Sequence, residues 1–156
     1  MRTRWITPRG RSDAGYSEGA VLMANNVTPF LTFTGQGRDA LELYAAVFPN
    51  AEVEQRTEFG PGEDGVEGTL RQAVLKIGKG RVRLIDTPHR TGFHFSSAMS
   101  LFVDCDSAQD VDTIAAALSE GGETLMPADT YDFAERFAWV ADPFGVNWQL
   151  SYGART

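Results

Sequence analysis

The sequence predicts an α+β fold made of two βαβββ modules that form cupped mixed sheets. Two segments with helical spacing of apolar residues lie about 70 residues apart. Each is preceded by one short segment rich in β-branched and aromatic residues and is followed by three more. Glycine and proline turns separate these segments, and the order is the same in both halves of the chain, which indicates an internal duplication.

The first module is predicted to span residues 23–90. It begins with the strand VTPFLTF (27–33), followed by a helix over about 38–48 that stops at Pro49-Asn50. The apolar positions with helical spacing are Ala40, Tyr44, Val47 and Phe48. The remaining strands are expected at 51–59, 68–77 and 81–86, the last two joined by a tight Gly-Lys-Gly hairpin turn.

The second module is predicted to span residues 91–156 and to share one structural unit with the first. Its first strand is MSLFVDC (99–105), and Asp106 is expected to cap the helix that follows. The helical positions are Val111, Ile114, Ala115 and Leu118. ETLMPADTY, RFAWVAD and NWQLSY then supply three strands.

Composition and charge exclude several classes of partner. A hydrophobic content of 42% in 156 residues is enough for a core. The net charge of −7 argues against nucleic acid, which needs a basic face. No apolar run reaches membrane-spanning length, so we expect no membrane partner. The single cysteine, Cys105, fits a reducing cytoplasm, where it is expected to act as a small buried hydrophobe.

Residues 1–22 differ in composition from the rest of the chain. Four arginines alternate there with Gly, Ser and Pro, and the apolar core of a secretory signal is missing. We interpret this segment as a flexible leader, or as an extension from a start codon upstream of Met23.

One helix for every four strands can cover only one face of each sheet. The other face must be covered by the twin module, by a second subunit or by a ligand. Two sheets curled towards each other would form a cleft between the halves, and such clefts are frequent ligand sites.

Several stretches, in order over about residues 25–152, carry a family resemblance: TPFLTFTGQGRDALELYAAVFPNAEV, FGPGEDGVEGT, MSLFVDCDSAQDVDTIAAALSEGGE and ADPFGVNWQL. They resemble the vicinal oxygen chelate superfamily of glyoxalases, bleomycin resistance proteins and dioxygenases. The chain is most similar to the PhnB-like branch, whose members are sometimes labelled demethylubiquinone methyltransferases. The resemblance implies paired βαβββ modules, a homodimer, and a cavity inside each cupped sheet.

Active relatives hold a divalent metal in this cavity with His, Glu or Gln side chains, and the metal receives two vicinal oxygens of the substrate. Carried over to this sequence, the resemblance places the ligand positions at Pro29 (or Thr28), Ser100 (or Met99), Gln72 and Gln149. Both histidines, His89 and His94, lie in the linker PHRTGFHF instead. Two amides without an imidazole make a poor divalent site, so we predict no cofactor, with a divalent metal as the alternative.

Alternation along the strands suggests where the two amides point. In NWQLSY, alternation places Gln149 on one face of the strand and Trp148 and Leu150 on the other. The apolar face should pack against the helices, so Gln149 is expected to point into the cup. In LRQAVL the same alternation separates Gln72 from Ala73. Gln72 either lines the cup or forms a cross-strand hydrogen bond with no ligand.

Aromatic and cationic side chains complete the set of candidate residues. Phe30, Phe102, Trp139 and Phe137 could form an aromatic cavity wall, although aromatic residues on strands are more often plain core. Tyr131 and Arg136 flank the loop ADTYDFAERF, which is expected over the cavity mouth. Arg136 could bind an anionic ligand there, while a solvated surface arginine is the commoner role. His94 is expected to be packed or at a dimer edge.

The loop TGQGRD (34–39) follows a strand and opens a helix, as nucleotide-binding loops do. It lacks the third glycine, and the chain lacks the βαβ crossovers of a dinucleotide-binding sheet. We interpret it as a simple turn and expect no methyl-donor site.

The predicted function is the binding of a small planar or aromatic molecule, such as a metabolite or antibiotic. The cavity would be largely apolar, with Gln72 and Gln149 as hydrogen-bond donors and without a catalytic metal. The alternative is a metal-dependent lyase, isomerase or dioxygenase whose ligands lie a residue or two from these positions. A structural or regulatory dimer without a ligand is the third class.

Overall fold

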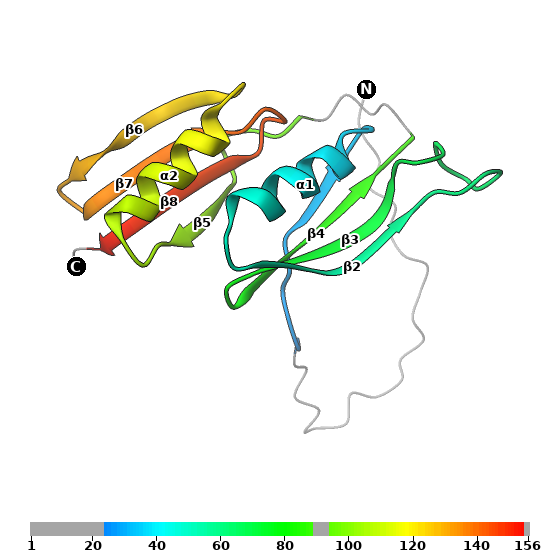
Figure 1. The fold of residues 1–156 in the computed structure, drawn as a ribbon, viewed down its shortest axis with the longest axis horizontal. Coiled ribbons are helices and arrows are strands. Elements are labelled where there is room, and N and C mark those ends of the chain that lie inside the picture. Colours follow the sequence, from blue (N-terminus) through cyan, green and yellow to red (C-terminus); the bar gives the residue numbers. More distant parts are fainter. Residues whose placement is uncertain (1–23, 89–93, 155–156) are drawn as a thin grey trace, which may run out of the picture.

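The computed structural model describes residues 24–88 and 94–154, which form two modules side by side (Figure 1). In chain order the elements are β1 (Phe30–Phe33), α1 (Gly37–Val47), β2 (Ala51–Glu58), β3 (Leu70–Ile77), β4 (Gly80–Asp86), β5 (Ser100–Asp104), α2 (Ala108–Ser119), β6 (Glu123–Tyr131), β7 (Ala134–Ala141) and β8 (Asn147–Ala154).

The strands form two four-stranded sheets of the same topology. The first has the order β1-β4-β3-β2 and the second the order β5-β8-β7-β6. The strand before each helix pairs in parallel with the last strand of its module, and the other neighbours are antiparallel. The predicted α+β fold of two βαβββ modules with mixed sheets is therefore confirmed.

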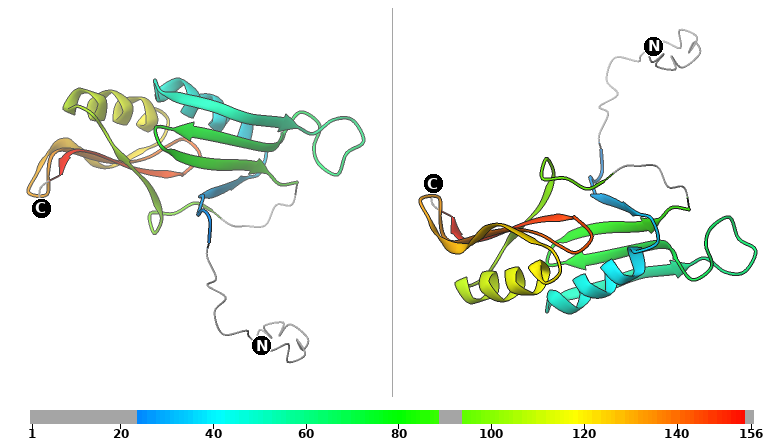
Figure 2. Two further views of the ribbon diagram at one scale, coloured as in Figure 1. Left: turned by 90° about the horizontal axis from the view of Figure 1, so that it is seen from below. Right: turned by 90° about the horizontal axis from the view of Figure 1, so that it is seen from above.

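Both helices lie on the same side of the two sheets (Figure 2). Helix α1 packs on β2, β3 and β4, and α2 packs on β6, β7 and β8. In β4, buried Val82 and Leu84 alternate with exposed Arg81 and Arg83, so Val82 and Leu84 face α1. The opposite face of each sheet, called the open face below, carries no helix of the described chain.

The core is continuous from one module to the other. Trp148 of β8 is the largest fully buried side chain, and its ring centroid lies 5.0 Å from Tyr44 and 5.2 Å from Phe48, both of the first module. Helices α1 and α2 also contact each other. These contacts fix the two sheets relative to each other.

The ends of the elements differ from the predicted ones in two informative places. Strand β1 begins at Phe30 and not at Val27, which is 88% exposed. Asp106 is not the cap of α2: Ser107 takes this place, and its Oγ accepts a hydrogen bond of 3.1 Å from the amide of Asp110. Either residue type suits an N-cap, so the sequence alone could not choose between neighbours.

The segment 1–22 lies outside the described residues, so its interpretation as a leader or an extension stays a prediction. Within the described residues, no helix is long and apolar enough to cross a membrane.

Candidate functional site

The open face of the second sheet carries an amide between two aromatic side chains. Gln149 of β8 is the cross-strand partner of Phe102 in β5 and of Trp139 in β7. Its neighbours along the strand, Trp148 and Leu150, are fully buried on the helix side. Partners in register share a face of the sheet, so these three side chains form one row on the open face. Phe102 is 57% exposed and Gln149 and Trp139 are half-buried, so the row is accessible to a ligand.

Hydrogen bonds hold the polar side chains of this face in place. The Nε2 of Gln149 donates to the Oγ of Ser100 at 2.8 Å. The indole Nε1 of Trp139 donates to Oδ1 of Asn147 at 2.9 Å, and the amide nitrogen of Asn147 donates to the carbonyl of Gly145. The Oε1 of Gln149 has no protein donor among the described residues. The face therefore presents a fixed amide oxygen between aromatic rings.

An aromatic cluster closes one end of this face. The rings of Tyr131 and Phe133 stack at 5.5 Å, and both contact the edge or face of Phe137 at 5.8 and 5.0 Å. The Tyr131 hydroxyl donates to the carbonyl of Pro127 at 2.9 Å. Phe137 is buried beneath this cover, while Phe133 is 49% exposed. Of the predicted aromatic wall, Phe137 therefore behaves as core.

The open face of the first sheet is more polar. Phe30 of β1, Arg83 of β4, Val74 of β3 and Gln55 of β2 are successive cross-strand partners and form one row. Phe30 is 56% exposed. Gln72, two residues before Val74, donates through Nε2 to Oε1 of Gln55 at 3.2 Å. Gln72 thus forms the cross-strand hydrogen bond that the sequence left open, and it lies on the same face as the exposed ring of Phe30.

Arg136 does not belong with the other candidate residues. It is the cross-strand partner of Tyr152 on the helix side of the second sheet, and its Nε lies 2.7 Å from Oδ1 of Asp112 in α2. The prediction that Arg136 lies at a cavity rim, free for an anionic ligand, is therefore wrong. Its position in the loop sequence suggested the rim, whereas alternation with Ala138 and Val140 correctly indicates the helix side.

The described chain contains a groove of about 990 Å³ between the β3–β4 hairpin and β5. Pro29, Ser100 and Phe102 are among its lining residues, but Gln72 and Gln149 are not. These two amides lie on the open faces of different sheets. The described residues of one chain therefore do not form a single cavity lined by both amides.

The positions at which the resemblance implies metal ligands hold a donor set that fits a divalent metal poorly. Pro29 has no ligating side chain, and Gln72 and Ser100 are already hydrogen-bonded to Gln55 and Gln149. His94 is exposed in the linker, and His89 lies outside the described residues. Among the described residues, no group of three His, Cys, Asp or Glu side chains could hold a metal ion. A hydroxyl and two amides without imidazole or carboxylate are weak ligands for such an ion.

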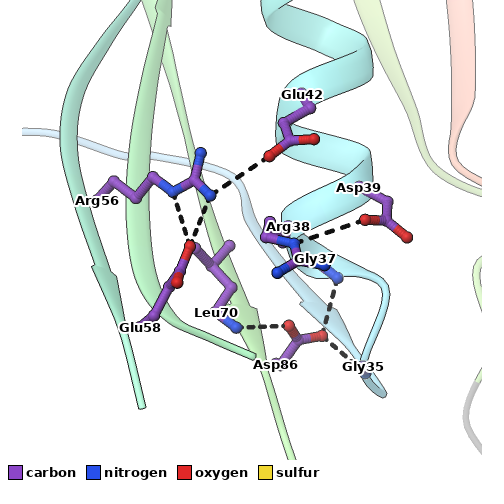
Figure 3. Close-up of polar contacts among 9 residues, drawn as sticks. All are labelled: Gly35, Gly37, Arg38, Asp39, Glu42, Arg56, Glu58, Leu70 and Asp86. Atoms are coloured by element: carbon purple, nitrogen blue, oxygen red, sulfur yellow. Dashed lines mark hydrogen bonds and ion pairs between the residues drawn. The ribbon is translucent and has the colours of Figure 1, made fainter. Parts of the chain in front are cut away.

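The glycine-containing loop before α1 is occupied by a carboxylate of the chain itself (Figure 3). Oδ1 of Asp86 accepts hydrogen bonds from the amides of Gly35 and Gly37 at 2.7 and 2.9 Å, and Oδ2 accepts from the amide of Leu70 at 2.8 Å. Asp86 is only 4% exposed. A Cβ at Gly37 would lie 3.0 Å from this carboxylate. The amides that a phosphate-binding loop would offer to a nucleotide are therefore already used.

Comparison with known proteins now places this geometry in a family. The family model described as 3-demethylubiquinone-9 3-methyltransferase matches residues 25–151. The chain belongs to this family. It is a PhnB-like member of the vicinal oxygen chelate superfamily.

Solved structures agree with this assignment. A PhnB protein from Bacillus cereus is 32% identical, with a TM-score of 0.78, over 83% of this chain and 100% of that chain. Protein PA1353 from Pseudomonas aeruginosa is 24% identical, with a TM-score of 0.74, over 83% of this chain and 98% of that one. A glyoxalase/bleomycin resistance protein from Albidiferax ferrireducens T118 is 13% identical, with a TM-score of 0.57, over 81% and 97%. The last two show the fold alone. No curated protein matches the chain.

Sequence reasoning missed two features of these faces. The contact between Gln149 and Ser100 joins residues of neighbouring strands that are 49 positions apart, and no local pattern indicates it. Arg83, in contrast, alternates with buried Val82 and Leu84 in RVRLID, and this alternation could have placed it on the open face.

Proposed function

We propose that this PhnB-like protein binds a small, planar and largely apolar molecule on its open faces. Gln149 and Gln72 supply the amide groups that orient the ligand, and no catalytic metal takes part. The observation that carries this proposal is the row Phe102–Gln149–Trp139, in which a hydrogen-bonded amide lies between two accessible aromatic side chains. Apolar surfaces with a few fixed polar groups are typical of small-molecule sites.

We also propose that the protein acts as a homodimer in the cytoplasm. Phe30 and Phe102 on the open faces, with Met99 beside β5, are more than half exposed. Such exposed apolar residues on faces that no helix covers are typical of interfaces. A second copy would shield these residues and enclose the ligand. The groove that the described part of a single chain forms is not lined by Gln72 or Gln149 and so cannot enclose a ligand together with both amides. The half-buried single cysteine supports a reducing compartment.

The alternative of a metal-dependent lyase, isomerase or dioxygenase requires stronger ligands than these positions offer. Metal analysis of protein purified without a histidine tag separates the two proposals. Stoichiometric metal that the wild type retains and Gln149→Ala loses would contradict the metal-free proposal.

Ligand binding is tested by a thermal-shift screen with planar aromatic metabolites and antibiotics. A ligand at one hundred times its dissociation constant stabilises the folded state by about 2.7 kcal/mol, a readily measured increase in melting temperature. Gln149→Leu should abolish most of this increase because the amide is lost from the row. Gln109→Leu, on the exposed surface of α2, is the matched control and should preserve it. Unchanged affinity in both Gln72→Leu and Gln149→Leu would contradict the proposed site.

A further inference from the structure

Arg83 projects from the middle of the open face of the first sheet. It lies between buried Val82 and Leu84 in β4, whose side chains face α1, and it is exposed on the opposite side. Its cross-strand partners are Phe30 on one side and Val74 on the other.

No carboxylate of the described chain neutralises this guanidinium. The other described arginines each lie within 4.0 Å of an acidic side chain, namely Arg38, Arg56, Arg71, Arg81 and Arg136. Arg81 is only two residues away on the same face, and it donates two hydrogen bonds of 2.7 Å to Glu54. Among the described residues, Arg83 has neither an ion pair nor a hydrogen bond through its side chain.

The surroundings of Arg83 are suited to an amphiphilic ligand. Phe30 beside it is 56% exposed, Val74 on its other side is apolar, and Gln72 lies two residues from Val74 on the same face. A guanidinium binds carboxylates and phosphates through two parallel hydrogen bonds. The adjacent ring offers a flat surface to an aromatic group.

We propose that Arg83 binds the oxyanion group, a carboxylate or a phosphate, of a planar ligand whose apolar body lies against Phe30. This inference rests on the proposed function, since it assigns a charge to the ligand of the same open faces. The chain as a whole has a net charge of −7 and repels anions. The guanidinium of Arg83, unpaired among the described residues, supplies the local positive charge that would attract an anionic ligand to the open face of the first sheet.

Three matched probes test the proposal on the full-length protein: 2-naphthoate, 2-naphthyl phosphate and the neutral 2-naphthamide. Amide chemical shifts followed by NMR during titration report both affinity and location. At least one anion should bind about tenfold more tightly than the amide and shift the resonances of Phe30 and Arg83. Raising the salt concentration should weaken anion binding and leave the amide unaffected. The ranking of the two anions tells whether the site prefers a carboxylate or a phosphate.

Substitutions distinguish a direct contact with Arg83 from the effect of positive charge anywhere on this face. Arg83→Gln should weaken anion binding about tenfold, and Arg83→Lys should recover part of it. Arg81→Gln removes an arginine of the same face that Glu54 already neutralises, and it should change the affinity for the anions by less than about twofold.

Equal binding of anions and amide, with no effect of Arg83→Gln, overturns this inference. If Gln149→Leu then weakens all three probes, the proposed function itself stands. Anions that bind without shifting Phe30 and Arg83 also overturn the inference.

Discussion

The hydroxyl of Tyr44 in α1 donates a hydrogen bond of 2.6 Å to Oδ2 of Asp142, which lies 98 residues further along the chain. The indole of Trp148 donates to the same oxygen at 2.9 Å, and the amides of Phe144 and Val146 donate to Oδ1. Asp142 is 2% exposed, so these four donors replace the water it loses. The turn that begins β8 is thereby attached to the helix of the other module.

Removing the Tyr44 hydroxyl should destabilise the protein. Tyr44→Phe leaves the buried carboxylate with one donor fewer and should lower the free energy of unfolding by about 1–3 kcal/mol. Burial, and then the charge of Asp142, raises the pKa of Tyr44, so its hydroxyl remains a donor throughout the neutral and mildly alkaline range. Urea unfolding measures the change. Tyr152→Phe is the control, and an equal loss in both variants would contradict the special role of Tyr44.

Replacing Asp86 should weaken the first module. The two carboxylate oxygens of Asp86 together accept hydrogen bonds from three backbone N–H groups. Asp86→Asn replaces one of these oxygens by NH₂, so at least one buried backbone N–H loses its acceptor. We expect a loss of about 1–3 kcal/mol. Hydrogen exchange should show faster exchange at Gly35, Gly37 and Leu70. Asp64→Asn, in an exposed loop, should have no effect, and unchanged exchange in Asp86→Asn would disprove this role.

Cys105 should react slowly with alkylating reagents. Burial, followed by the nearby charge of Asp110, raises the pKa of its thiol to about 11. The thiolate is the reactive form, so at pH 8 we expect iodoacetamide to react on the order of a hundredfold more slowly than with free cysteine. The rate should rise about tenfold per pH unit until the pH approaches the pKa. Asp110→Asn should increase the rate, and a plateau already near pH 9 would contradict this prediction.

Charge on the open faces should prevent the proposed dimer. Phe30→Asp and Phe102→Asp place a carboxylate on exposed apolar positions, where burial by a second copy would be costly. Sedimentation velocity should then show monomers. Val66→Asp is the control, because Val66 is 58% exposed in the β2–β3 loop and belongs to neither sheet. A dimer that persists in both phenylalanine variants would place the interface elsewhere.

Much of this architecture follows from local patterns. The helical spacing around Tyr44 and Val111 and the turn residues between strands give the element order, because each element must bury one apolar face. The alternation in NWQLSY places Gln149 opposite to Trp148 and Leu150, as the structure shows. Element ends were less accurate, since neighbouring residues such as Asp106 and Ser107 are equally suitable caps.

The sequence by itself thus determined the two modules and the face of β8 on which Gln149 lies, because backbone periodicity and burial are local properties. Only the tertiary structure decided which groups meet. Arg136 pairs with Asp112 and not with a ligand, and Gln149 donates to Ser100. Asp86 at the end of β4 accepts hydrogen bonds from the loop before α1, and Asp142 accepts from amides of its own turn. The physical reason is that charged and polar side chains find partners through sheet register and helix packing, and these bring together residues up to 98 positions apart.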